Sequence, residues 1–218
     1  MTKFGDIRRV YAESHKRYGD TSAALLTPKG RHDLRFLPIM EILKNRTEGS
    51  LLDYGCGIGL LYESIRKANL EVKYTGWDMT VSFIESCQHR FGSTERFRLI
   101  EPDTPITEHF DFVVCSGVFN LATSEDEGES HTYVRERLYQ LLSVTDQVLT
   151  CDFLSPFVDF EQDGAQHVAI ELVAKWLVES GHRRFIIRHD LLPYEFTVVV
   201  YKDSTIIRPQ NVYESEPS

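Results

Sequence analysis

The stretch LLDYGCGIG, residues 51–59, decides the fold. Its first four residues form a short, mostly apolar strand, and glycines follow at positions 55, 57 and 59. Glycine has no Cβ, so a ligand can approach the backbone there. A helix beginning at Leu60 would present free N–H groups and a positive dipole end to that ligand. The stretch therefore predicts a ligand-binding turn between a strand and a helix, with a tight turn that binds nothing as the alternative.

Strands and helices alternate through the rest of the chain. We expect further strands at 72–77, 97–100, 112–115, 147–153, 184–188 and 196–201, and helices at 60–67, 81–91, about 134–142 and 168–179. The acidic segment 124–129 reads as a solvated loop, and the short link 191–193 can join only antiparallel strands. Two helices precede the sheet, one in the first twenty residues and one from Asp33 as N-cap, with a kink or late start at Pro38. This order predicts an α/β fold, a doubly wound Rossmann-like and mostly parallel sheet that binds ligands beyond its strand ends.

Length and composition limit the classes of function. The 218 residues suit a single domain, with a helical N-terminal cap at 1–46, a sheet core at 50–202 and a polar tail at 203–218. A formal charge of −9 argues against a nucleic-acid partner. We expect no membrane association and a cytoplasmic location, because no apolar run reaches roughly 20 residues and the first thirty lack a signal-peptide core. The four cysteines stand far apart, and we expect no metal site.

Two acids define the chemistry of the expected ligand. The glycine spacing is GxGxG rather than the GxGxxG of dinucleotide sites, and Asp53 stands two residues before the first glycine. A carboxylate there would repel phosphate and favour an ammonium group. Asp78, at the end of the second strand, can accept hydrogen bonds from both ribose hydroxyls. A nucleoside with positive charge is predicted, and S-adenosylmethionine fits that description.

At this point the sequence resembles the class I S-adenosylmethionine-dependent methyltransferases. The resemblance runs through LLDYGCGIG, YTGWDMT (74–80), FRLIEPD (97–103) and DFVVCSGVFN (111–120), in that order. Arg35-Phe36, the run SGVFN and the ending HDLLPYEFTVVVYK (189–202) look like a group of small bacterial methyltransferases. The similarity spans roughly residues 10 to 202. It implies a seven-stranded sheet whose last strand is antiparallel.

The resemblance also implies a cofactor site. Asp53 would lie near the ammonium group of S-adenosylmethionine, Asp78 would bind its ribose and Met79 its adenine face. Asp103 matches the acid that faces the adenine amino group, although Pro102 replaces the family's common glycine. The residues expected along the methionine half are Gly55, Gly57, Gly59, Ser116 and Gly117.

The methyl acceptor is less defined. His15 is a candidate general base, and Tyr11 and Tyr18 on the same helical face are expected to bind the acceptor, although this face could simply pack on the sheet. Asn120 follows the fourth strand where acceptors sit, and its run SGVFN is not the Asn/Asp-Pro-Pro-Tyr signature of amide and base methyltransferases. Tyr194 and Glu195 lie at the start of the last strand and could close the acceptor pocket, although Tyr194 could instead be a half-buried strand aromatic.

Arg35 could bind the cofactor carboxylate or be a surface arginine. We predict an enzyme that methylates an oxygen or nitrogen of a small molecule, a sugar or secondary metabolite, mainly by positioning it. An NAD(P)-dependent oxidoreductase and a non-catalytic module that binds S-adenosylmethionine to regulate a partner are the alternatives.

Overall fold

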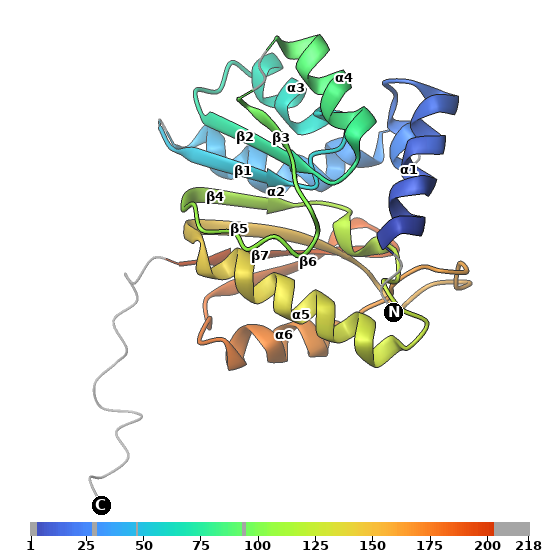
Figure 1. The fold of residues 1–218 in the computed structure, drawn as a ribbon. Coiled ribbons are helices and arrows are strands. Elements are labelled where there is room, and N and C mark those ends of the chain that lie inside the picture. The colour runs from blue at the N-terminus through green and yellow to red at the C-terminus, as the bar shows by residue number, and fades with distance from the viewer. Residues whose placement is uncertain (1–3, 28–29, 47, 93–94, 203–218) are drawn as a thin grey trace, which may run out of the picture.

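A seven-stranded sheet forms the centre of the molecule, with helices on both faces (Figure 1). The computed structural model describes residues 4–27, 30–46, 48–92 and 95–202, so the predicted polar tail lies outside the described residues. The strands are β1 (Ser50–Tyr54), β2 (Lys73–Asp78), β3 (Phe97–Leu99), β4 (Phe110–Cys115), β5 (Thr145–Leu154), β6 (Phe185–Leu192) and β7 (Glu195–Tyr201). Their order is β3-β2-β1-β4-β5-β7-β6, and only β7 runs antiparallel to both of its neighbours. The predicted fold class and antiparallel last strand are confirmed.

The helices divide between the two faces according to their apolar residues. α2 (Arg31–Lys44), α3 (Leu60–Lys67) and α4 (Val81–Phe91) share one buried cluster with the sheet, and α5 (Glu127–Ser143) and α6 (Ile170–Glu179) share the other. β1 shows why both clusters form. Leu51 points into the first and Leu52 into the second, because successive side chains of a strand face opposite sides.

The first helix lies apart from these layers. α1 (Phe4–Tyr18) stands at the carboxyl edge of the parallel strands, where Tyr11 packs edge-on against Phe83 of α4 with 6.0 Å between ring centroids (Figure 1). The short 3₁₀ helix η1 (Ser22–Leu25) follows it and packs against α1. Of the helices in the predicted cap, α1 and η1 therefore stand at this edge, whereas α2 joins a sheet face.

Two helix starts differ from the sequence predictions. α5 begins at Glu127, because the Asp126 side chain caps it by accepting a 2.9 Å hydrogen bond from the Glu129 N–H, so half of the expected acidic loop is helical. α2 begins at Arg31 after Gly30, and it continues through Pro38 to Lys44. Burial of Phe36 and Ile39 on either side of Pro38 offsets the lost backbone hydrogen bond. No described helix is long and apolar enough to cross a membrane.

Candidate active site

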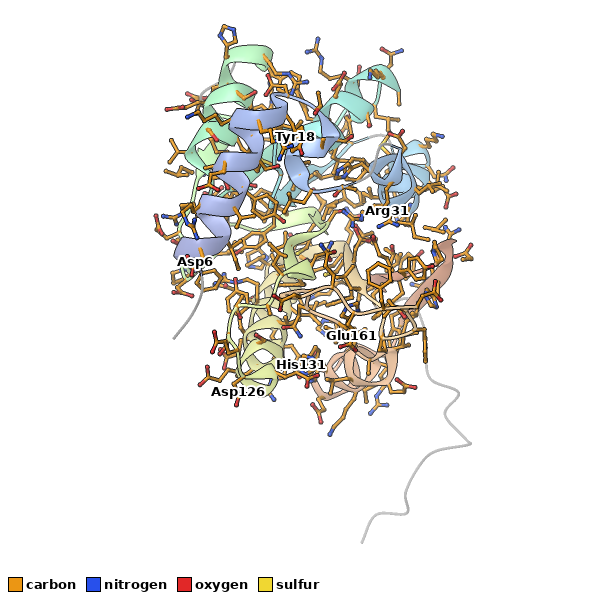
Figure 2. The ribbon with its side chains drawn as sticks, turned by 90° about the vertical axis from the view of Figure 1, so that its right-hand side faces the viewer. Asp6, Tyr18, Arg31, Asp126, His131 and Glu161 are labelled. Carbon is orange, nitrogen blue, oxygen red and sulfur yellow. The ribbon has the colours of Figure 1, made fainter. Side chains whose placement is uncertain are left out.

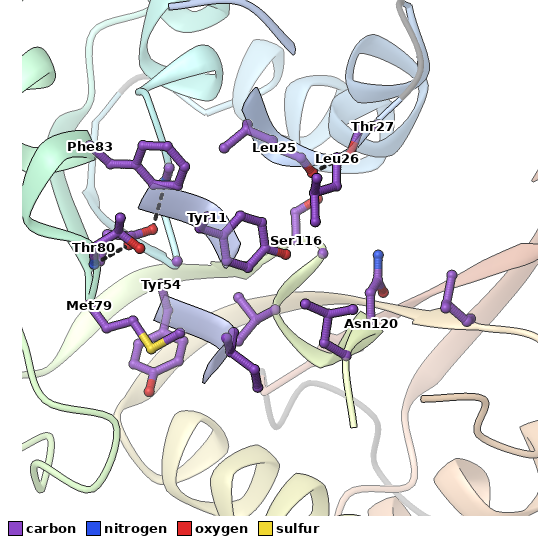
Figure 3. Close-up of a pocket in the computed structure, with 18 of the residues that line it drawn as sticks. Tyr11, Leu25, Leu26, Thr27, Tyr54, Met79, Thr80, Phe83, Ser116 and Asn120 are labelled. Atoms are coloured by element: carbon purple, nitrogen blue, oxygen red, sulfur yellow. Dashed lines mark hydrogen bonds between the residues drawn. The ribbon is translucent and has the colours of Figure 1, made fainter. Parts of the chain in front are cut away.

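A cavity of about 240 Å³ opens at the carboxyl edge of the parallel strands (Figure 3). Its walls come from α1, η1, the start of α2, the loops after β1, β2, β3, β4 and β5, and the first residue of β7, with one side chain each from α4 and α5. Figure 2 looks onto this edge, with α1 on one side and Arg31 across from it. The topology thus gathers segments from both ends of the chain at one site, as expected for a sheet of this type.

The glycine loop after β1 forms one wall. Backbone N–H groups of Gly55 and Cys56 donate to the Trp77 carbonyl at 2.7 and 2.9 Å, which fixes the loop against the end of β2. Gly55 and Gly57 line the cavity with φ values of +79° and +54°. A Cβ at position 57 would lie 2.7 Å from Leu25 Cδ2, so this glycine also makes room for η1.

Gly59 lies on the far side of that loop. A Cβ there would lie 2.8 Å from Phe91 Cε2 and 3.2 Å from Cys87 Sγ, both on α4. The residue does not line the cavity. Its φ of +77° at the N-cap of α3 favours glycine, and the close packing of α4 leaves no room for a Cβ. These two local causes account for the glycine without a ligand.

Asp78 forms the floor where β2 ends. Its Oδ2 accepts a hydrogen bond from the Gly57 N–H at 2.9 Å, and its Oδ1 accepts one from the Thr80 N–H at 2.7 Å. Burial raises the pKa of this carboxyl, and the backbone hydrogen bonds oppose the shift. Each carboxylate oxygen retains a second lone pair for a ligand hydroxyl. Apolar Met79, Ile100 and Pro102 continue the wall beside it, as an adenine face requires.

Asp53 lies beneath the loop rather than in the cavity. It is buried in the sheet, and its Oδ2 accepts a 2.6 Å hydrogen bond from the Tyr74 hydroxyl. Burial raises its pKa to about 7. The residue is not part of the cavity wall, so the structure does not support the direct contact with an ammonium group that the sequence suggested.

The loop after β4 is held by a buried carboxylate. Ser116, which lines the cavity, donates to Asp152 Oδ2 at 2.5 Å, and Asp152 Oδ1 accepts from the Thr197 hydroxyl at 2.7 Å. Burial raises the pKa of Asp152 to about 6. Gly117 also lines the cavity, and a Cβ on it would lie 3.0 Å from Arg35 Nη1. The glycine therefore admits a guanidinium to this loop.

An ion pair between α2 and β7 is the main feature that sequence reasoning missed. Arg35 is only 6% exposed, which excludes the surface position considered for it. Its Nε donates to Glu195 Oε2 at 2.5 Å, and Arg31 Nη1 donates to Glu195 Oε1 at 3.1 Å. All three residues line the cavity. The available signal was a lone acid opening an otherwise apolar strand, with two arginines one helical turn apart.

Two of the four predicted acceptor-binding residues line the cavity. Tyr11 and Asn120 do so, and burial raises the pKa of Tyr11 to about 12. Tyr18 is 42% exposed at the far end of α1 and lies outside the cavity wall (Figure 2). Tyr194 also lies outside it, with its hydroxyl donating to Asp159 at 2.5 Å. Asp103, predicted at the adenine, is exposed and outside the wall, although its neighbour Pro102 is part of it.

His15 occupies a different position from the one its predicted role requires. Its Nε2 lies 2.9 Å from Asp20 Oδ1, and its ring packs edge-on against Phe83 at 5.1 Å between centroids. It is not part of the cavity wall. His15 lies one helical turn after Tyr11 on α1, outside the cavity and next to α4. This location argues against a role as general base.

Comparison with known proteins agrees with this geometry. A family model described as a methyltransferase domain matches residues 52–145, which contain the glycine loop, Asp78 and the loop after β4. The putative methyltransferase Rv1506c of Mycobacterium tuberculosis is 24% identical over 169 residues, covering 76% of this chain and 100% of that protein. The chain is an S-adenosylmethionine-dependent methyltransferase with the Rossmann-like fold of such enzymes. Its cofactor is S-adenosylmethionine, as the sequence predicted.

Solved methyltransferase structures share its fold. Magnesium protoporphyrin IX methyltransferase from Synechocystis, with bound SAH, superposes with a TM-score of 0.62 at 16% identity, covering 93% of this chain and 96% of that one. The DhpI–SAH complex also gives 0.62, at 13% identity over 88% and 93% of the two chains. At these identities the likeness concerns the fold, and the acceptor of this methyltransferase has to be inferred from its own residues.

Proposed function

We propose that this methyltransferase transfers a methyl group from S-adenosylmethionine to an oxygen or nitrogen of a small molecule, such as a sugar or secondary metabolite. One observation carries the proposal. A single cavity joins the glycine loop and Asp78 to a second, polar group that includes Asn120, Thr123 and Gln162. The two groups lie at the ends of different strands, so cofactor and acceptor can occupy neighbouring positions. The net charge of −9 favours a small acceptor over a nucleic acid.

The cofactor half is assigned to the residues that line the cavity there. Asp78 accepts the ribose hydroxyls, and Met79 packs against the adenine. Backbone at Gly55, Gly57 and Gly117 passes the methionine half, beside the hydroxyl of Ser116. Asp53, Gly59 and Asp103 shape or support the surrounding loops without direct contact, because none of them lines the cavity.

When bound, the cofactor supplies an already activated methyl group on sulfur. The protein's task is to hold the acceptor atom in line with the sulfur–methyl bond, and such positioning can lower a barrier by about 7–11 kcal/mol. Tyr11 on α1 and Leu25 on η1 close one side of the cavity, and Ala165 on the β5–α6 segment closes another. Excluding water strengthens the electrostatic interactions inside.

The test is methyl transfer from labelled donor into a bacterial small-molecule extract. We expect label in small products with the wild-type chain and a large reduction with Asp78→Ala at low donor concentration. Tight S-adenosylmethionine binding without any labelled product would favour the regulatory module instead. Titration with NAD(P) is the parallel control, and tight binding of that nucleotide would favour an oxidoreductase.

A further inference from the structure

We propose that the acceptor is a carboxylic acid, held through its carboxylate by Arg31 and Asn120, and that the product is its methyl ester. This inference rests on the proposed function and narrows it to one class of acceptor atom. It is carried by the side-chain donors gathered in one half of the cavity and by the lack of a competent base among the residues that line it.

The donors lie on the acceptor side of the sheet. Asp78, in the cofactor half, follows β2, whereas Asn120 follows β4. Glu195 pairs with Leu154 at the end of β5, and it anchors Arg31 at 3.1 Å. Glu195, which holds Arg31, therefore lies three to four strands away from Asp78 in the order β2-β1-β4-β5-β7.

Several N–H groups remain available there. Arg31 uses Nη1 on Glu195, and its side chain is 28% exposed. Arg35 has its Nε on Glu195, and its Nη1, next to Gly117, donates to Thr27 Oγ1 at 3.5 Å.

Asn120 Nδ2 lies 3.7 Å from a Cβ position on Gly117, and its buried Oδ1 has no hydrogen-bond partner among the described residues. Figure 3 shows this amide nitrogen directed into the cavity. The Arg35 guanidinium lies beside this amide at Gly117, and the Arg31 guanidinium is held on the same Glu195 carboxylate. Together these donors match the two oxygens of a carboxylate.

The arginines are also held in place for such a ligand. Glu195 is 3% exposed and accepts from both of them, which fixes both guanidinium groups beside one buried carboxylate. The carboxylate of Glu195 compensates one of the two positive charges. Asp152, whose pKa is raised to about 6, is still mostly ionised at neutral pH and offsets the other charge. The guanidinium groups are therefore fixed at the cavity wall before a ligand with hydrogen-bond acceptors, such as a carboxylate, binds.

The titratable groups of the cavity are poor bases. Burial raises the pKa of the lining tyrosines, that of Tyr11 to about 12, so they keep their protons. Burial and the neighbouring guanidinium lower the pKa of His32 to about 4, which makes its imidazole a weak base. Glu195 is paired with two arginines, and Asp78 is held by two backbone N–H groups in the cofactor half. Asp163 lies exposed to solvent on the β5–α6 segment.

A carboxylate needs no base at neutral pH. An alcohol or ammonium acceptor must lose a proton, whereas a carboxylate oxygen already offers a lone pair. That lone pair forms the bond to the methyl carbon while the bond from this carbon to sulfur breaks and its electrons stay on sulfur. The carboxylate and sulfonium charges cancel, the products are a neutral ester and a thioether, and no proton moves.

The experiment exploits the chemistry of methyl esters. The full chain is incubated with S-adenosylmethionine labelled in the methyl group and a bacterial small-molecule extract, and the products are treated with mild alkali. Methyl esters release labelled methanol, which is collected by distillation, but methyl ethers and N-methyl groups do not. We expect most of the label in the methanol. Label that stays in alkali-stable products overturns the carboxylate inference and leaves the proposed function intact, whereas no label in any product overturns both.

An arginine series tests the binding residue. We expect Arg31→Gln to raise the amount of extract needed for half-maximal methanol release at least tenfold, and Arg31→Lys to restore part of it. Cofactor affinity by calorimetry should change less than twofold. Arg9→Gln, on the exposed face of α1, is the matched control and should behave as wild type. Unchanged half-saturation in Arg31→Gln, or a parallel loss of cofactor affinity, would contradict the assignment.

Discussion

Removal of the Asp78 carboxylate is the most direct test of the cofactor site. In Asp78→Ala, two charge-assisted hydrogen bonds to the ribose are lost, each contributing about 1.5 kcal/mol at the lower end of the usual range. The sum of about 3 kcal/mol corresponds to an approximately 100-fold rise in the dissociation constant for S-adenosylmethionine. The same change leaves the N–H groups of Gly57 and Thr80 without their acceptor. These two donors are buried, so the variant should also lose about 1–3 kcal/mol of stability for each that stays unpaired.

The assay therefore needs two measurements. Isothermal calorimetry gives the dissociation constant, and circular dichroism melting shows that the variant is folded at the temperature of the titration. Glu85→Ala, which removes an exposed carboxylate from α4, is the matched control and should change neither quantity noticeably. A folded Asp78→Ala variant whose affinity falls less than threefold would refute the proposed ribose contact.

Three further perturbations test other parts of the site. Because burial raises the pKa of Asp53 from 3.8 to about 7, the folded protein binds more protons than the unfolded chain between these values, and its stability should fall as pH rises through this window. Asp53→Asn should flatten that slope in urea unfolding at pH 5 to 8, and an unchanged slope would contradict the shift. Glu195→Ala leaves the buried Arg35 cation unpaired and should lower the free energy of unfolding by about 3–5 kcal/mol. The double variant Arg35→Met with Glu195→Leu removes both charges and should lower it much less in the same assay. Gly57→Ala, at a φ of +54° and with its Cβ against Leu25, should lose about 1–2 kcal/mol from backbone strain plus a packing penalty. Adding Leu25→Ala should relieve the packing penalty but not the backbone strain. If the stability losses of the two single variants simply add in the double variant, as measured by thermal melting, the two residues do not contact each other.

The fold could be predicted because its signals are local. The apolar strand 51–54 followed by alternate glycines fixes a strand, a turn and a helix within about fifteen residues. The short link before Glu195 allows only an antiparallel pairing, and the structure has a turn at Pro193 and Tyr194. The missed boundaries also have a local cause. Asp126 belongs to a run of acids that reads as loop by charge, yet one of them caps a helix.

The site was only partly predictable because half of it depends on distant contacts. Residues directly after strands, such as Asp78 and Asn120, reach the cavity because the topology brings strand ends to one edge. The ion pair between Arg35 and Glu195 joins residues 160 positions apart. The local patterns, a lone acid opening a strand and two arginines one helical turn apart, do not show that these segments meet. Helical periodicity placed His15 on a face with Tyr11, but a face of four turns extends well beyond a small cavity.

The buried ion pair is better explained by function than by stability. Taking Arg35 and Glu195 out of water carries a desolvation cost that their attraction offsets only partly, and apolar residues of similar size are often as stable or more so. Stability alone would therefore not favour this arrangement in a protein of this size. What the pair does achieve is a fixed guanidinium beside Gly117, with Arg31 held by the same carboxylate. A solvent-exposed arginine would lose conformational entropy each time a ligand bound. The Arg35 guanidinium is already fixed in the folded protein, so this entropy is lost once, during folding.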